Sequence, residues 1–199
     1  EAEQKTCAAQ LRDASLDMKE FVERIIGLFR AAPSPKEGDA ALADACCADI
    51  VSKAEALAKA RGYRIQTTRE QFGRRQVAHA ADMARCMMNL VDNAMSYAPP
   101  ETTGHLAFSE SSLPDSPHSR ALRMDVEDEG PGFSEEALAR ATERFYRQDA
   151  ARLHDGHHGL GLHIVQKEMR RCSGALHLEN TEKGARATLF IPLLDEQKE

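Results

Sequence analysis

Two asparagines spaced four residues apart are the first residues in the chain whose type and position could do chemistry. Asn89, Asn93 and Tyr97 stand at i, i+4 and i+8, so on a helix their side chains form one polar row. Asparagine is a mediocre helix former and is costly to half-bury unless its amide is hydrogen-bonded. Amide oxygens of this kind suit Mg²⁺. Asparagines that only cap neighbouring loops are the alternative.

A carboxylate followed by two glycines is the second candidate. Asp128 begins the run Asp128-Glu129-Gly130-Pro131-Gly132-Phe133, directly after residues that alternate as in a half-buried strand. Gly130 and Gly132 would let the backbone turn closely beneath a ligand that Asp128 faces. An ionised carboxylate only accepts hydrogen bonds, so it selects an amino group such as the exocyclic amine of adenine. An ordinary Asp-led turn is the alternative.

A glycine-rich run before a predicted helix is the third candidate. It reads Gly156-His157-His158-Gly159-Leu160-Gly161-Leu162. Glycines at a helix N-terminus let backbone N–H groups reach phosphate oxygens, and the helix dipole favours that negative charge. Flexible turns share this composition, so the run by itself is a weak indication.

An aromatic pair flanked by cations is the fourth candidate. The segment Glu143-Arg144-Phe145-Tyr146-Arg147 lies between the second and third. It could form a lid in which Phe145 anchors the segment and Arg147 lies near phosphate. The end of an amphipathic helix is an equally good interpretation of these residues alone.

The elements that must position these residues follow from hydrophobic periodicity. Mixed strands with interleaved helices predict an α/β fold, an α+β two-layer sandwich whose sheet is covered by helices on one face. The Ser/Pro-rich stretch 109–119 is predicted to be a variable loop. Helices are predicted at 39–60, 80–97, 134–143 and 159–171, and strands at 63–67, 76–78, 105–109, 121–127, 175–181 and 186–192.

The N-terminal part predicts a separate helix. Residues 4–30 carry apolar side chains at 4-3 spacing, a seam that needs a partner helix. Pro33 and Pro35 end that helix, so we expect a helix and linker over 1–35 and a compact domain over 36–199. The first residues resemble the middle of a helix, and we expect the chain to be part of a longer protein.

Composition narrows the possible functions. A net charge of −6 argues against a nucleic-acid partner. The five cysteines form no CxxC pair and are interpreted as reduced, packed thiols of a cytoplasmic protein. No apolar run approaches the ~20 residues that span a bilayer, so any membrane attachment is expected in N-terminal regions outside this chain.

Taken in order, the four segments resemble the signature boxes of bacterial sensor histidine kinases. The run Asn89-Leu90-Val91-Asp92-Asn93-Ala94 is similar to the N box, 128–133 to the first glycine box, 143–147 to the F box and 159–162 to the second glycine box. The resemblance extends over about 36–193. It implies a Bergerat-type ATP site, transfer of the γ-phosphate of ATP to a histidine on a dimerisation helix, and relay to a response regulator. The seam in 4–30 looks like the second helix of that dimerisation hairpin.

The resemblance also implies roles for single residues. Asn93 would bind Mg²⁺, and Asn89 would support the phosphate side. Asp128 would bind the adenine amine, with Tyr97 against the base. Further nucleotide contacts are implied for Gly130, Gly132, Phe145, Arg147, Gly159, Leu160, Gly161, Leu162 and, in the closing strand, Thr188.

Three departures from the family pattern keep alternatives open. Ser96 stands where Lys or Arg is common, His157 stands where glycine is common, and none of the eight histidines lies in the acceptor pattern of the family. Hydrolytic ATPases of the same fold use a glutamate base where this chain has Asn89, an amide that cannot take a proton from water. An anti-sigma-type serine kinase and a degenerate, non-catalytic ATP-binding module are the remaining alternatives.

Overall fold

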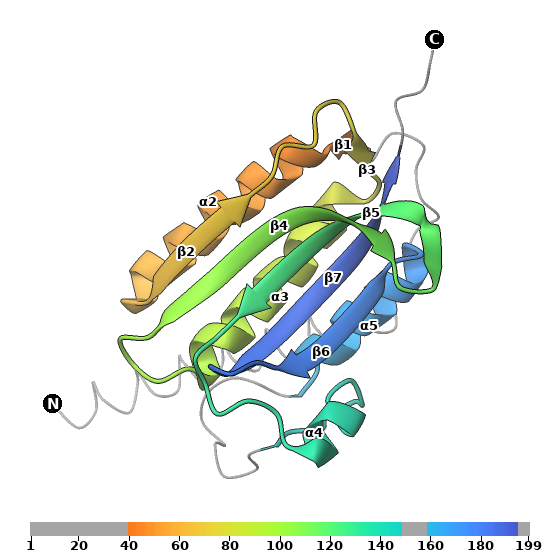
Figure 1. Cartoon of the computed structure of the whole chain (residues 1–199). Coiled ribbons are helices and arrows are strands. Elements are labelled where there is room, and N and C mark those ends of the chain that lie inside the picture. The colour runs from red at the N-terminus through yellow and green to blue at the C-terminus, as the bar shows by residue number, and fades with distance from the viewer. Residues whose placement is uncertain (1–39, 149–158, 195–199) are drawn as a thin grey trace, which may run out of the picture.

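The computed structural model describes residues 40–148 and 159–194. Seven strands within these ranges form one mixed sheet, in the order β1-β3-β7-β5-β4-β2 with β6 also paired to β7. Helices α2, α3 and α5 lie side by side on one face, and α4 stands beyond the end of the sheet (Figure 1). The predicted two-layer sandwich with helices on one face is therefore confirmed. The elements are β1 (Ala41–Leu42), α2 (Ala43–Arg61), β2 (Arg64–Arg69), β3 (Gln76–Val77), α3 (Ala80–Tyr97), β4 (Thr103–Leu113), β5 (Ser116–Glu127), α4 (Glu135–Arg140), α5 (Gly161–Arg171), β6 (Ala175–Asn180) and β7 (Ala185–Leu194).

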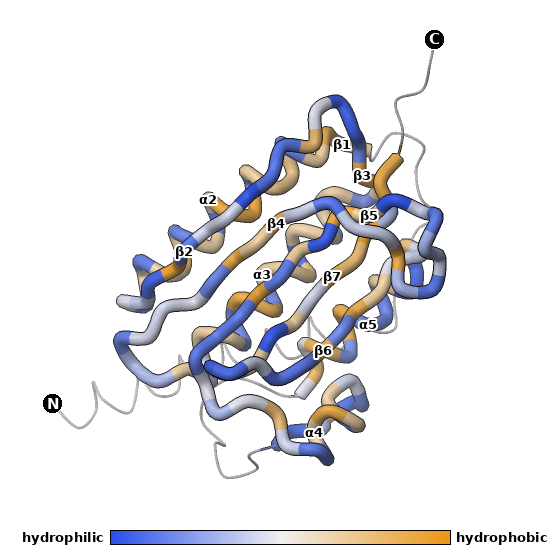
Figure 2. The backbone as a smooth tube through the Cα atoms, viewed as in Figure 1, coloured by the Kyte–Doolittle hydropathy of each residue, from blue (hydrophilic) through white to orange (hydrophobic). Residues whose placement is uncertain are grey.

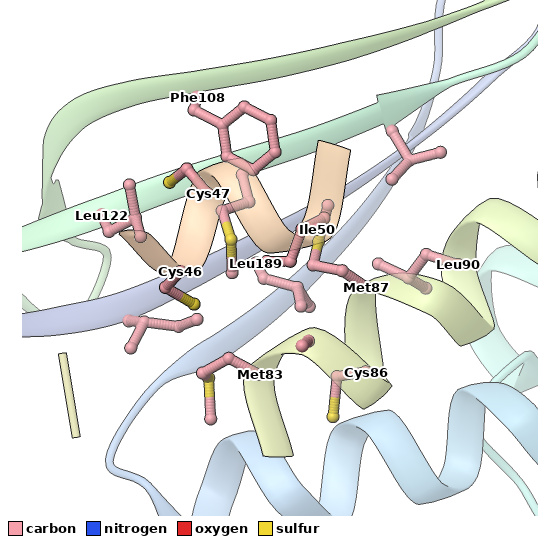
Figure 3. Close-up of a cluster of buried hydrophobic side chains, with 14 of the residues drawn as sticks. Cys46, Cys47, Ile50, Met83, Cys86, Met87, Leu90, Phe108, Leu122 and Leu189 are labelled. Atoms are coloured by element: carbon pink, nitrogen blue, oxygen red, sulfur yellow. The ribbon is translucent and has the colours of Figure 1, made fainter. Parts of the chain in front are cut away.

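The core lies between the sheet and the helices. Figure 2 shows hydrophobic and hydrophilic residues mixed along the strands of the sheet. Leu122 and Met124 alternate with charged residues along β5 and belong to the buried cluster that includes residues of α2 and α3. Met83 and Met87 on α3 are fully buried and meet them there. Figure 3 shows this cluster, in which side chains from α2, α3 and the sheet interdigitate.

The predicted loop over 109–119 is wrong. β4 and β5 continue as a long antiparallel hairpin and are joined by a two-residue turn at Pro114 and Asp115. Cross-strand contacts stabilise this extension, including an ion pair of 3.0 Å between Arg120 and Glu110. Serine and proline are common in loops, but strand pairing here supplies the hydrogen bonds that a loop would take from water.

The described cysteines behave as packed thiols. Cys46, Cys47 and Cys86 are buried in the core, and Cys172 is half-buried; all four are free. Burial raises the pKa of Cys46 to about 11 and the pKa values of Cys47 and Cys86 to about 12. The thiolate forms are therefore scarce near neutral pH.

Several predictions lie outside the described residues. These are the helical seam in 4–30, the linker that ends at residue 35, Cys7 and His157. Among the described helices, none has the length and apolar character required to cross a membrane.

Candidate functional site

The four candidate segments meet at one pocket. It lies between α3, the N-terminus of α5, the loop after β5 and the segment 146–148. Of the residues proposed from the sequence, the pocket is lined by Asn89, Asn93, Tyr97, Asp128, Gly132, Arg147, Gly159, Gly161 and Leu162.

The polar row of α3 forms one wall of the pocket. Asn89, Asn93 and Tyr97 all reach it, as their spacing predicts. Successive members of the row are one turn apart, about 6 Å along the helix axis. A Cβ placed on Gly161 would lie 3.6 Å from Nδ2 of Asn93. The first residue of α5 therefore faces the Asn93 amide, which brings an oxygen ligand beside a helix N-terminus.

Asp128 is a buried carboxylate near the Tyr97 end of the polar row on α3. Its side chain is 8% exposed. Its Oδ1 accepts hydrogen bonds from the backbone N–H groups of Gly130 (2.8 Å) and Ala185 (3.2 Å). Burial raises the pKa of Asp128, while these two hydrogen bonds oppose the rise. Among the described residues no donor is recorded for Oδ2, so the carboxylate can accept a hydrogen bond from a ligand in the pocket.

Two glycines allow the backbone to pack around Asp128. A Cβ on Gly130 would lie 2.8 Å from Oδ1 of Asp128 and 3.1 Å from the carbonyl oxygen of Tyr97. A Cβ on Gly184 would lie 2.3 Å from the carbonyl oxygen of Asp128. Gly130 itself does not line the pocket. Its contribution is the close approach of the loop to the end of α3.

The residues at the start of α5 pack closely against the backbone of Phe145 and Tyr146. Gly159 has a φ of +67°, and a Cβ there would lie 2.7 Å from the carbonyl oxygen of Tyr146. The N–H of Phe145 donates to the carbonyl of Gly159 over 3.0 Å. Leu160 is fully buried and does not line the pocket, so it anchors the turn while its neighbours Gly161 and Leu162 face the cavity.

Phe145 does not reach the pocket. It is 57% exposed, with a φ of 64°. The neighbouring Tyr146 lines the pocket instead, and the guanidinium of Arg140 lies 4.8 Å from its ring centroid. The left-handed backbone at Phe145, held by its bond to Gly159, turns the two aromatic side chains to different surroundings.

Thr188 also does not reach the pocket. It is buried on the face of the sheet away from the helices, where its hydroxyl donates to Oδ1 of Asp125 over 2.6 Å. Ala185 and Ala187 are the residues of β7 that line the pocket. Side chains alternate along a strand, and the apolar Leu189 follows this helix-facing set. That alternation in the sequence could have assigned Thr188 to the other face.

The pocket also contains residues for which the sequence predicted no ligand contact. Asp92 lines the pocket, and its Oδ1 pairs with Arg61 at the end of α2 over 2.5 Å. Asp92 is three residues beyond Asn89, so helical spacing could have identified it. The hydroxyl of Ser96 donates to the carbonyl of Asp92 over 2.8 Å, which turns it back onto its own helix. Phe133 and Gln148 also line the pocket.

Comparison with known proteins gives one family. The sequence model of the family of histidine kinase-, DNA gyrase B- and HSP90-like ATPases matches residues 78–195 of this chain. The chain is 33% identical over 137 residues to the signal transduction histidine-protein kinase/phosphatase MprB of Mycolicibacterium smegmatis, which covers 69% of this chain and 26% of that protein. Its identity to MprB of Mycobacterium avium is 38% over 117 residues, covering 58% and 21%. The chain thus spans about a quarter of the length of these relatives.

Solved structures share the fold. A mycobacterial sensor histidine kinase MprB aligns with a TM-score of 0.61 and 20% identity, covering 75% of this chain and 96% of that one. Full-length ShkA in complex with AMPPNP aligns with a TM-score of 0.74 and 21% identity, covering 98% and 40%. The catalytic domain of histidine kinase ThkA aligns with a TM-score of 0.62 and 17% identity, covering 77% and 93%.

Proposed function

Because the chain belongs to the family of histidine kinase-, DNA gyrase B- and HSP90-like ATPases, we propose that it contains the ATP-binding catalytic domain of a sensor histidine kinase. The domain takes up residues 36–199. It binds Mg²⁺-ATP and transfers the γ-phosphate to a histidine on a dimerisation helix, from which a response regulator receives it.

One observation carries this proposal: a buried carboxylate and the N-terminus of a helix line the same pocket, beside successive turns of α3. Asp128 and Gly130 lie against the Tyr97 end of the polar row, and Gly161 lies against Asn93 one turn earlier. A buried acceptor at one end suits the adenine amine. The N-terminus of α5 at the other end suits phosphate.

The donor set at the phosphate end fits Mg²⁺. The Asn93 amide oxygen would hold the ion together with phosphate oxygens and water, and Asn89 stands one turn away on the same wall. When bound, Mg²⁺ neutralises negative charge between phosphates. The N–H groups at the start of α5 and the guanidinium of Arg147 would donate hydrogen bonds to the same phosphate oxygens.

Transfer to a histidine is favoured over hydrolysis. A hydrolytic site needs a base that takes a proton from water, and the amide of Asn89 cannot do so. Positioning supplies most of the catalysis in phosphoryl transfer, so an acceptor imidazole has to be brought in line with the γ-phosphate. We propose that residues 1–35 comprise the second helix of a dimerisation hairpin and the linker after it. This hairpin would present the imidazole and pair with a second copy. The domain would act in the cytoplasm, where ATP is available.

Two measurements on this chain test the proposal. Calorimetry should detect binding of ATP that is stronger with Mg²⁺ than with EDTA, and clearly weaker binding of GTP. Labelled ATP should leave no stable, acid-labile phosphate on this chain alone, and label should appear on an added dimerisation hairpin of the parent protein that carries its acceptor histidine. Rapid release of inorganic phosphate without the hairpin would favour a hydrolytic ATPase, and binding without any transfer would favour a non-catalytic module.

A further inference from the structure

A short extended segment of the pocket wall is held on both sides by side-chain amides. On one side, Asn180 accepts from the N–H of Phe133 over 2.7 Å and donates to the carbonyl of Phe133 over 2.8 Å. On the other side, Gln148 accepts from the N–H of Ser134 over 2.9 Å and donates to the carbonyl of Gly132 over 3.4 Å. The backbone of 132–134 is thus paired on both edges, as a strand inside a sheet is.

The Asn180 side belongs to the sheet. Asn180 is the last residue of β6 and pairs with Ala185 of β7, whose N–H holds Asp128. Gly132 has a φ of +74°, and a Cβ there would lie 2.8 Å from Oδ1 of Asn180. This amide therefore fixes the loop after β5 to the rigid part of the fold.

The Gln148 side belongs to the segment that closes the pocket. Tyr146, Arg147 and Gln148 all line the cavity. The segment is fixed to the start of α5 at its beginning by the bond between Phe145 and Gly159. Gln148, the last described residue of this segment, bonds it to the loop 132–134. Its amide therefore links the wall that carries Arg147 to the wall that carries Asp128.

We propose that Gln148 is a positioning residue for the nucleotide: it holds the segment 146–148 against the loop 132–134 and thereby slows nucleotide release. This inference rests on the proposed ATP site. The two bonds require a donor and an acceptor on one side chain, which an amide provides and a carboxylate does not. They also require the length of glutamine, since the side chain bridges two backbone groups of another loop.

The first test compares Gln148→Ala with Gln66→Ala, a matched control that removes an exposed amide from β2. We expect Gln148→Ala to raise the Kd for Mg²⁺-ATP by about three- to tenfold, mainly through faster dissociation, because one to two solvent-exposed hydrogen bonds are lost. Its thermal unfolding midpoint should match that of the wild type. Asn180→Ala should lower the midpoint as well as the affinity. A Kd and dissociation rate equal to those of the wild type in Gln148→Ala would overturn the inference.

The second test compares the Kd of Gln148→Glu with that of the wild type at several pH values. A merely structural role of Gln148 would not make this ratio depend on pH. At pH 7 the new carboxylate can still accept from Ser134 but cannot donate to Gly132. On acidification it takes a proton and regains a donor. The ratio of variant Kd to wild-type Kd should therefore fall as the pH is lowered from 7 towards 4, because an ordinary glutamate has a pKa of about 4.3. A ratio that does not change with pH would count against the two-bond role. Failure of the wild type to bind ATP would instead overturn the proposed function.

Discussion

The backbone N–H of Ala185 donates to Oδ1 of Asp128 over 3.2 Å, across 57 residues of sequence. The first residue of the last strand thus orients the carboxylate that follows β5. Gly130 donates to the same oxygen, so Oδ1 is satisfied by backbone, while no donor within 40–148 and 159–194 bonds to Oδ2. This division of the two oxygens underlies the first two predictions.

Replacing Asp128 with asparagine should weaken ATP binding while it stabilises the apo domain. Asp128→Asn should weaken ATP binding by about 10- to 100-fold, since a hydrogen bond to a charged group contributes ~1.5–3 kcal/mol. The apo domain should become more stable at neutral pH, because burial penalises the ionised carboxylate and the asparagine oxygen can still accept from Gly130 and Ala185. Calorimetry and thermal unfolding measure the two effects. Equal affinity for ATP and GTP in the wild type would contradict the adenine assignment.

ATP binding should weaken in acid at a higher pH than an ordinary aspartate would cause. Burial raises the pKa of Asp128, and the protonated form no longer offers a carboxylate to the adenine amine. Affinity is therefore present above the raised pKa and declines as pH falls through it. The apo fold responds with the opposite sign, because a raised pKa means that protonation favours the folded state. Titrations over a pH series, with Asp128→Asn as the reference without this group, should show both trends.

The magnesium dependence of ATP binding should disappear in Asn93→Ala. The amide of Asn93 faces the start of α5, where the phosphates are proposed to bind, and alanine leaves the ion without its protein oxygen. ATP affinity measured with Mg²⁺ should fall to the value measured with EDTA, and phosphotransfer to the added hairpin should be lost. A variant that transfers phosphate at the wild-type rate would show that the ion is held elsewhere.

Two glycine-to-alanine changes should have contrasting effects. Gly184→Ala places a methyl group against the backbone of Asp128 and Gly130, and it should lower the free energy of unfolding by about 1–3 kcal/mol and weaken ATP binding with it. Among the described residues, the methyl group of Gly161→Ala meets the Asn93 amide alone, at 3.6 Å, and alanine suits a helix better than glycine. It should keep or raise stability yet lower ATP affinity about tenfold by filling the phosphate approach. Urea unfolding and calorimetry distinguish the two.

Those parts of the site that depend on local spacing could be predicted from the order of the residues alone. Helix α3 spans the predicted 80–97, and its 3.6-residue period placed Asn89, Asn93 and Tyr97 on one wall before any partner was known. The positions of Asp128 at the end of a strand and of glycines at the start of α5 could likewise be predicted from the sequence, because neighbouring residues set turns and helix starts.

The long-range neighbours of those residues could not be predicted, because they depend on how distant segments pack together. The alternation along β7 separates Thr188 from Ala185 and Ala187 in the sequence, but the contact of Ala185 with Asp128 and the hydrogen bond of Thr188 to Asp125 depend on pairing between distant strands. The role of Gln148 depends on a loop that lies 16 residues away in the chain. The hairpin extension over 109–119 could not be predicted for the same reason. Its backbone hydrogen bonds come from cross-strand partners, which the composition of the segment does not reveal.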